Sequence, residues 1–449
     1  MALRRRLPAG GQYSVIGWST AYVASTYAYA STHRHWSTGT RLCTVGIYLA
    51  MTTVRRPRSA RPAAIATRVL LYLLAAWTTL GVLVAGLFPG AVAALVALAL
   101  YTTLPLIAFV RWRGWPFYPG KAFRLLVVRP FWYAQLLLPV VSAAGLLGLL
   151  GGAPFGHALM AGQVGAATAL VLLGITLGAG YLGAGHLVVR RVDVEVPGLA
   201  SEFDGLRIAQ LSDLHVGPHT SRRFLRRIVN ATRALSADLI AVTGDLVDDR
   251  AEDVASYAKA LGSLTAPLGV YMIPGNHDVY AGWEDVERAL HAAKLGTVLV
   301  NDARVIRRGN AAIAIVGTGD PAGGRTGAAR SAPDVERALA DVPVGATVIA
   351  FAHNPALWPS LAARGVALTL SGHTHWGQFA LPTLGWSLAS PFLEYAMGAH
   401  VDNDALLYIS PGTGYWGIPF RLGASPEVTL VTLRGALAAK AHVHKARVA

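Results

Sequence analysis

Long uninterrupted apolar runs fill the first part of the chain, and short apolar runs separated by polar segments fill the rest. Four of the long runs contain no Lys, Arg, Asp or Glu. A helix needs roughly 20 such residues to cross about 30 Å of hydrocarbon. We therefore expect four transmembrane helices, over Val69–Phe88, Ala91–Val110, Phe131–Leu150 and Val164–Leu187.

From Val192 onward, short β-like runs alternate with amphipathic segments, a pattern typical of an α/β domain. The expected strands are Leu206–Leu211, Leu239–Thr243, Val270–Ile273, Thr297–Val300, Ala312–Val316, Thr347–Ala352, Ala367–Leu370, Ala405–Ile409 and Val428–Leu433. The expected helices are Ser221–Leu235, Glu252–Leu264, Glu284–Ala293, Ala332–Leu339 and Pro355–Ala363. The predicted organisation is a poorly defined basic segment over residues 1–65, a multi-span α-helical membrane domain over 66–190, and an α/β domain over 191–449.

The composition supports a membrane protein. Apolar residues make up 53% of the 449 residues and charged residues only 14%, against about 25% charged residues in typical soluble domains. The mean hydropathy is +0.44. These values argue against a fully soluble chain and against a disordered one. Cys43 is the one cysteine, which excludes an intramolecular disulfide framework and a cysteine-rich zinc site.

The charge is distributed very unevenly. Residues 1–192 hold 17 Lys and Arg and no acidic residue, whereas residues 193–449 hold all 24 acidic residues and 22 basic ones. Basic residues gather before the first expected span and between the second and third, and none lies in the Pro89–Gly90 turn or in Gly151–Gln163. Positively charged loops remain in the cytosol. We therefore expect a multi-pass protein with both ends and the α/β domain in the cytoplasm. Because topology explains the basic residues, we expect no nucleic acid partner.

Two features of the first half remain open. Ser14–Ala30 is a weak additional span, and an alternative is that translation begins at Met51, which precedes a basic stretch before the first expected span. Only five of the 39 basic residues are lysine, a bias typical of GC-rich genomes that suggests a bacterial source.

Polar clusters follow five of the expected strands, at the point where each strand ends. In open α/β sheets, ligands bind at the carboxyl ends of strands, so these clusters can converge. The clusters are Ser212-Asp213-Leu214-His215, Gly244-Asp245-Leu246-Val247-Asp248, Pro274-Gly275-Asn276-His277-Asp278, His353-Asn354-Pro355 and Ser371-Gly372-His373-Thr374-His375.

These clusters supply carboxylate, amide and imidazole groups, a mixed set suited to Mn, Fe, Zn or Co. Seven candidate ligands exceed what one ion needs, and a carboxylate can bridge two ions. The D-x-H and H-x-H spacing predicts that both side chains lie on one face of an extended segment. Two ions about 3.5–4 Å apart can hold a phosphoryl oxygen and generate a hydroxide nucleophile near neutral pH. The candidate ligands are Asp213, His215, Asp245, Asn276, His353, His373 and His375.

The motifs D-L-H, G-D-L-V-D, G-N-H-D, a lone histidine and G-H-T-H, in this order over about Leu206–Pro411, resemble the calcineurin-like metallophosphoesterase superfamily, here of a membrane-anchored bacterial type. The resemblance implies two packed mixed β-sheets flanked by helices, with the site at one sheet edge. It implies two divalent metal ions and a phosphoesterase activity.

The resemblance also implies residue roles. Asp213, His215 and His375 would hold the first ion. Asn276, His353 and His373 would hold the second, with Asp245 bridging. His277 resembles the histidine of the family that contacts the phosphate and protonates the leaving group, and Asp278 would orient that histidine.

Structural roles are considered beside functional ones for the other polar and aromatic residues. Asp248 fits a supporting or helix-capping role better than ligation, and His219 reads as a loop residue. Pocket lining and core packing both remain open for four aromatic residues, Trp283, Trp376, Tyr415 and Trp416. A helical cluster of arginines either faces anionic lipid or is simply exposed to solvent, and the sequence favours neither. The cluster is Arg222, Arg223, Arg226 and Arg227.

The leading hypothesis is a membrane-anchored, two-metal phosphohydrolase that cleaves phosphomonoester, phosphodiester or pyrophosphate bonds of a small-molecule or lipid-linked substrate. An alternative is a membrane sensor or transporter regulated by a metal-binding domain, but the expected spans carry no ionisable residue at their centres. A metal-binding module without catalysis is a third class, and the presence of His277 and Asp278 counts against it.

Overall fold

The computed structural model describes residues 77–78, 81–113, 121–217, 220–436, 439–444 and 447–449. The predicted basic segment over residues 1–65, the additional span at Ser14–Ala30 and the alternative start at Met51 lie outside these residues, as does His219. The first predicted span, Val69–Phe88, is described only in its second half, where residues 81–87 are helical.

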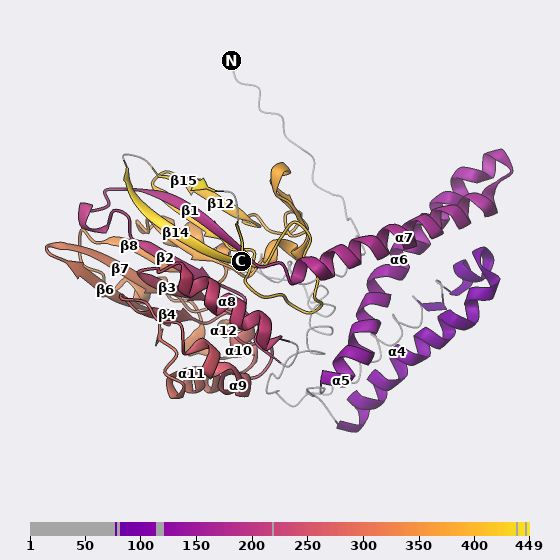
Figure 1. The fold of residues 1–449 in the computed structure, drawn as a ribbon, viewed down its shortest axis with the longest axis horizontal. Coiled ribbons are helices and arrows are strands. Elements are labelled where there is room, and N and C mark those ends of the chain that lie inside the picture. The colour runs from indigo at the N-terminus through magenta and orange to yellow at the C-terminus, as the bar shows by residue number, and fades with distance from the viewer. Residues whose placement is uncertain (1–76, 79–80, 114–120, 218–219, 437–438, 445–446) are drawn as a thin grey trace, which may run out of the picture.

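An arm of long helices extends from the α/β domain (Figure 1). In this helical arm, α6 and α7 form an antiparallel hairpin whose glycines allow close approach, since a Cβ on Gly165 would lie only 2.6 Å from the carbonyl oxygen of Ala144. The elements of the arm are η1 (Pro89–Ala91), α4 (Val92–Arg113), α5 (Lys121–Phe123), η2 (Arg124–Val128), α6 (Arg129–Gly152), η3 (Ala153–Phe155) and α7 (Ala158–Ala184).

The last predicted span was misplaced by several residues. The helix α7 begins at Ala158 and not at Val164, because Gly156 reverses the chain in the left-handed region with φ +73° and good helix formers follow at once. The predicted loop Gly151–Gln163 therefore shrinks to a short turn. The helix ends at Ala184, before the predicted Leu187.

Among the described residues, α7 is the one helix that is long and apolar enough to cross a membrane, while the apolar stretches Pro89–Tyr101 and Val140–Phe155 are shorter. Its large side chains point outward, with Ile175 64% and Leu182 75% exposed. Such surfaces are unusual on a soluble helix and mark a membrane or protein contact.

Two mixed sheets form the α/β domain, as predicted. The first runs in the order β15-β1-β14-β2-β3-β4-β5, with β16 beside β1, and the second in the order β12-β13-β9-β8-β7-β6. The first sheet contains β1 (Val188–Pro197), β2 (Arg207–Leu211), β3 (Leu239–Thr243), β4 (Val270–Ile273), β5 (Thr297–Val298), β14 (Glu427–Ala436), β15 (Lys440–Val443) and β16 (Arg447–Val448). The second contains β6 (Asp302–Arg308), β7 (Ala311–Gly317), β8 (Thr347–Phe351), β9 (Leu368–Ser371), β12 (Gly398–Asp402) and β13 (Ala405–Ile409), and a separate hairpin joins β10 (Ala380–Leu381) to β11 (Trp386–Ser387).

The core lies between the sheets and under the helices outside them. Along β3, Leu239 and Ala241 face the second sheet, whereas Ile240 and Val242 face helices, as the alternation of strand side chains requires. Figure 1 shows α8, α9 and α11 grouped on one side of the domain. The remaining elements are η4 (Ser201–Phe203), α8 (Arg222–Ala234), α9 (Glu252–Leu261), α10 (Asn276–Tyr280), α11 (Trp283–Ala292), α12 (Pro321–Thr326), η5 (Ala329–Ser331), α13 (Val335–Leu339), η6 (Pro355–Leu357), α14 (Trp358–Ala362), η7 (His375–Gln378) and η8 (Pro382–Leu384).

The strand β1 joins the helical arm directly to the domain. It begins at Val188, shortly after α7 ends at Ala184, and pairs parallel with β14 near the other end of the chain. No strand was predicted here, since the last predicted span ends at Leu187 and the first predicted strand begins at Leu206. Val192 and Val194 are buried while Arg191 is exposed, so the alternation of a strand is present but begins inside the apolar run.

Candidate metal centre

The polar clusters meet at the carboxyl ends of five strands, three in the first sheet and two in the second. The loops after β2, β3, β8 and β9 and the short helix α10 after β4 supply the side chains. All seven predicted ligands are buried, and so are His277 and Asp278. A buried collection of carboxylates and imidazoles is stable only if the charges are matched or coordinate a cation.

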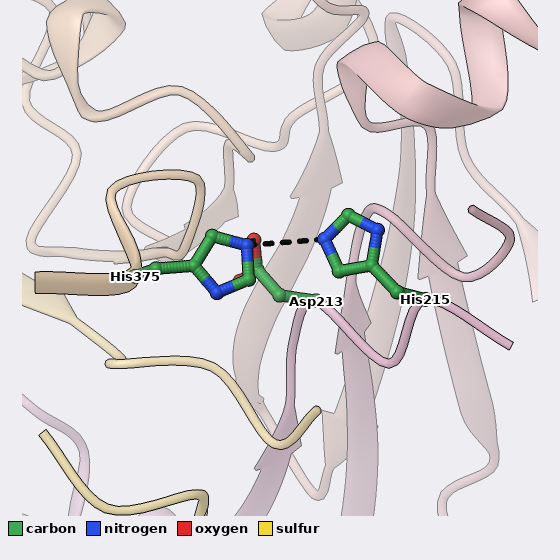
Figure 2. A group of neighbouring side chains, drawn as sticks. All are labelled: Asp213, His215 and His375. Atoms are coloured by element: carbon green, nitrogen blue, oxygen red, sulfur yellow. Dashed lines mark hydrogen bonds and ion pairs between the residues drawn. The ribbon is translucent and has the colours of Figure 1, made fainter. Parts of the chain in front are cut away.

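Three of the predicted first-ion ligands face one another (Figure 2). The Nε2 atoms of His215 and His375 lie 3.0 Å apart, and the Nε2 of His375 lies 3.3 Å from Oδ1 of Asp213. One ligand atom from each of the three lies within 4.8 Å of the others. The structure thus brings the first predicted set together.

The D-x-H and H-x-H side chains do not share a face of an extended strand, contrary to the prediction. Asp213 and His215 have φ values of 53° and 44°, and His373 and His375 have 70° and 49°, all in the left-handed region. Such a backbone is uncommon for residues with a Cβ and is concentrated at functional sites. The tight loops turn these side chains toward a common centre after the strands have ended.

The predicted second set also lies together. Nδ1 of His373 is 2.7 Å from Oδ1 of Asn276. The Nδ1–H of His353 donates to the carbonyl oxygen of Thr243 at 2.8 Å, which turns Nε2 toward the centre. That buried Nε2 faces Oδ2 of Asp245 at 3.2 Å.

Asp245 lies between the two sets. Its Oδ2 is 3.6 Å from Nε2 of His215 and 3.2 Å from Nε2 of His353. Its Oδ1 accepts a hydrogen bond of 2.8 Å from the backbone N–H of His277, which fixes the carboxylate. This is the place that a bridging carboxylate needs.

The electrostatics of the centre favour a charged carboxylate among imidazoles. Burial alone would raise the pKa of Asp245, but His353 and His277 outweigh burial and hold the pKa well below its usual range. Burial would lower the pKa of His353, but Asp245 raises it well above its ordinary value. Burial, with the charge of His353, lowers the pKa of His373 to about 3.

The donor set fits divalent cations. Two imidazole Nε2 atoms face each other at 3.0 Å, and a third buried Nε2, on His353, lies 3.2 Å from Oδ2 of Asp245. Imidazole, carboxylate and amide donors of this kind suit transition-metal ions. Their convergence at buried positions is the expected result when ligands are arranged around a cation.

His277 and Asp278 occupy the first turn of α10, and their relation differs from the expectation. Nδ1 of His277 lies 2.7 Å from the carbonyl oxygen of Asp248. The carboxylate of Asp278 instead accepts hydrogen bonds from the backbone N–H groups of Gly275, Leu246 and Val247, so it fixes the loops around the centre. Burial would lower the pKa of His277, but Asp245 and Asp248 raise it.

Arg421 is a further residue of the centre that no sequence motif indicated. Its guanidinium is buried and donates to Nδ1 of His375 at 2.8 Å and to the carbonyl oxygens of Pro411 and Gly414 at 2.5 Å. Burial lowers the pKa of Arg421 to about 9. It lies in an irregular segment beyond the last motif, so no local pattern distinguishes it from a surface arginine.

The remaining candidate residues contact a proposed ligand, pack in the hydrophobic core or lie near the cavity and His277. Asp248 supports the centre, with Oδ1 3.5 Å from Nδ1 of His215. Trp283 and Trp376 are buried in hydrophobic clusters. Tyr415 lines a cavity beside His215, and the ring of Trp416 lies 6.0 Å from that of His277.

Two packed mixed sheets with these side chains at the strand ends define a metallophosphoesterase domain. Residues 206–377 match the calcineurin-like phosphoesterase family. A metallophosphoesterase of Helicobacter pylori strain 26695, described as uncharacterized, is 32% identical over 59% of this chain and 68% of its own length. The chain belongs to the calcineurin-like phosphoesterase family.

Two vertebrate relatives are named as membrane proteins. Proteins from Danio rerio and Bos taurus, each called a transmembrane protein with metallophosphoesterase domain, are 35% and 32% identical over 55% of this chain. The matched region spans 57% of each of those relatives.

Proposed function

We propose that the chain is a membrane-anchored phosphohydrolase that uses two divalent ions and water to cleave phosphomonoester, phosphodiester or pyrophosphate bonds. The observation that carries this proposal is the position of Asp245 Oδ2 between Nε2 of His215 and Nε2 of His353. One carboxylate oxygen within reach of both ligand sets is what a two-ion centre requires.

The residues divide between the ions as the resemblance implies, with Mn, Fe, Zn or Co as the candidate metals. Asp213, His215 and His375 would hold the first ion, Asn276, His353 and His373 the second, and Asp245 both. Such ions supply a nucleophile at neutral pH by lowering the pKa of a bound water, and they stabilise charge on the phosphoryl group.

His277 is the proposed proton donor to the leaving group. Its backbone N–H holds Asp245, and its Nδ1 lies against the carbonyl oxygen of Asp248, which leaves Nε2 for the substrate. Because Asp245 and Asp248 raise the pKa of His277, the protonated form is available near neutral pH. Asp278 acts indirectly, by fixing the backbone of the loops after β3 and β4.

Membrane anchoring completes the proposal. The outward apolar side chains of α7 support a span, and the names of the vertebrate relatives are consistent with it. We propose that all four predicted spans cross a bacterial cell membrane and that the domain faces the cytoplasm. A domain held this close to a bilayer favours a lipid-linked phosphate as substrate.

The test uses the full chain purified in detergent and stripped of metal. Hydrolysis of p-nitrophenyl phosphate, bis(p-nitrophenyl) phosphate and pyrophosphate is measured with increasing Mn. We expect activity to require Mn. Asp245→Asn should lose most bound metal and at least about 10²-fold in turnover, because the loss even of residues that only support metal ligands costs about 10–100-fold. Asp285→Asn on the surface of α11 is the control. A full load of two ions in Asp245→Asn would contradict the assignment.

A further inference from the structure

A cavity of about 510 Å³ lies where the helical arm meets the domain. The arm contributes Leu125, Arg129 and Tyr181 to its wall, and the domain contributes His215, Arg223 and Arg227. His215 is also a proposed ligand of the first ion, so the cavity adjoins the metal centre. Figure 1 shows the end of α7 beside α8 and the C-terminus.

The charge of the wall favours an anion. The described residues that line the cavity include Arg129, Arg223 and Arg227 and no Asp or Glu. Guanidinium groups bind phosphate oxygens through paired hydrogen bonds. Arg129 also donates to the hydroxyl of Tyr415 at 3.3 Å, which places it beside the loop that follows the last metal motif.

The geometry of α8 selects two of the four arginines in the cluster at its N-terminal end. Arg223 and Arg227 are four residues apart and line the cavity together, as residues on one face of a helix do. Arg222 and Arg226 are absent from the lining and are exposed. Arg227 is further held in place by the carbonyl oxygens of Gly185 and Ala449, at 2.9 and 2.6 Å.

Apolar side chains cover another part of the wall. Leu125 and Tyr181 come from the arm, and Phe224 and Ile228 come from α8. Tyr181 lies in the last turn of α7, where an aromatic residue is favoured at a membrane interface. A small soluble phosphate ester has no apolar part that could contact these side chains, whereas an amphiphile has both a charged head and an apolar chain.

We propose that this cavity binds the headgroup of a phosphate-containing lipid, with Arg223 and Arg227 holding phosphate oxygens and the chains leaving past Leu125 and Tyr181 toward the bilayer. The inference rests on the proposed function, since it names the substrate class of the same metal centre. It also assigns separate roles to two pairs of arginines that adjoin in the sequence.

The experiment measures the full chain in detergent with Mn and p-nitrophenyl phosphate. Dioleoyl phosphatidic acid in mixed micelles is added as a competitor, and glycerol 3-phosphate, which has the same head without chains, is the matched soluble probe. Retention of labelled phosphatidic acid by the purified chain is measured in parallel, so that lipid binding is determined even without hydrolysis. The variants are Arg223→Ala/Arg227→Ala, Arg223→Ala alone, and the control Arg222→Ala/Arg226→Ala.

We expect phosphatidic acid to inhibit far more strongly than glycerol 3-phosphate. The Arg223→Ala/Arg227→Ala variant should weaken inhibition and retention by at least about tenfold, because each lost contact to a charged phosphate is worth a factor of that order. Arg223→Ala alone should also weaken inhibition and retention. This single variant keeps the hydrogen bonds of Arg227 to Gly185 and Ala449, so its effect cannot come from loss of those contacts. The control should match the unaltered chain.

Equal inhibition by glycerol 3-phosphate would overturn the lipid assignment, and equal loss in the two double variants would overturn the role of the cavity. If the chain hydrolyses none of the esters, the proposed function is rejected. If it still retains phosphatidic acid, and the Arg223→Ala/Arg227→Ala variant does not while the Arg222→Ala/Arg226→Ala control does, the lipid site is supported independently of hydrolysis.

Discussion

Burial and charge give the histidines of the metal centre different proton affinities. Asp245 raises the pKa of His353 well above its ordinary value, whereas burial and neighbouring positive charge lower those of His373 and His375. We therefore expect His353 to hold a proton more strongly than His373 and His375 in the metal-free chain. Since Nδ1 of His353 already donates to Thr243, the proton that a metal must displace is on Nε2.

We predict that metal binding releases a proton from His353. The affinity for Mn should rise by about tenfold per pH unit below the pKa of His353, because each binding event then removes one proton. Calorimetric titrations near pH 7 in buffers of different ionisation enthalpy measure this release. His353→Ala should bind more weakly and release correspondingly less. Binding with no proton release in the unaltered chain would refute the assignment.

The second prediction at this scale concerns His277. His277→Asn should keep both ions, because the histidine side chain is outside both proposed ligand sets, and should lose about 10²–10⁴-fold in turnover of alkyl phosphate esters. The loss should be smaller for p-nitrophenyl esters, whose leaving group needs no proton. Metal analysis and the two rates are compared in one preparation. Equal losses for both leaving groups would exclude a general acid, and loss of metal would indicate a structural role.

At the scale of secondary-structure elements, α7 contacts the segment that supports the metal centre. The backbone N–H of Arg421 donates to the carbonyl oxygen of Gly180 at 2.8 Å, and the side chain of Arg421 donates to the proposed metal ligand His375. A Cβ on Gly183 would overlap the carbonyl oxygen of Arg421, and one on Gly180 would overlap the ring of Phe420. The small face of α7 thus fixes the position of Arg421.

We predict that Gly183→Ala disturbs the first metal site from outside it. Overpacking of this kind costs about 1–3 kcal/mol, and the displaced Arg421 should weaken Mn binding at the His375 site. The melting temperature and the metal stoichiometry of the full chain in detergent are the two measurements. Gly174→Ala is the matched control, because a Cβ there meets nothing within 4 Å. Unchanged metal binding in a destabilised Gly183→Ala chain would show that the junction does not reach the centre.

At the scale of the whole molecule, charge is separated along the chain. The basic residues of the first half gather at one end of the predicted spans, while the acidic residues lie in the domain. The domain begins at Val188, close behind α7, so in the proposed topology the direction of that helix sets the side of the bilayer on which the domain lies. The cavity between the arm and α8 would then lie at the membrane surface.

We expect a reporter inserted at Gly156 to be external and a reporter after Ala449 to be cytoplasmic. Gly156 lies in the exposed turn between α6 and α7, where a Cβ would meet nothing within 4 Å. Alkaline phosphatase and green fluorescent protein fusions measure the two sides. An external reading at the C-terminus would reverse the orientation, and a cytoplasmic reading at Gly156 would show that α6 and α7 do not both cross.

The pattern of apolar and polar residues was sufficient to predict the buried strands and the motifs that follow them. β3, β4 and β13 have the predicted bounds, because each is a short buried run ended by Gly, Pro or a polar cluster. The motifs predicted that the seven candidate ligands and His277 lie close together, since each motif follows a strand whose carboxyl end must lie at one edge of a sheet. The family follows from the same residues.

Tertiary structure decided the rest. β6 and β12 are edge strands, and their half-exposed residues carry little of the apolar pattern that reveals a buried strand. The left-handed backbone of Asp213 and His215, the burial of Arg421 against His375 and the separation of Arg223 and Arg227 from their neighbours all depend on segments distant in sequence. Periodicity records which face of an element is apolar, and only packing determines what that face meets.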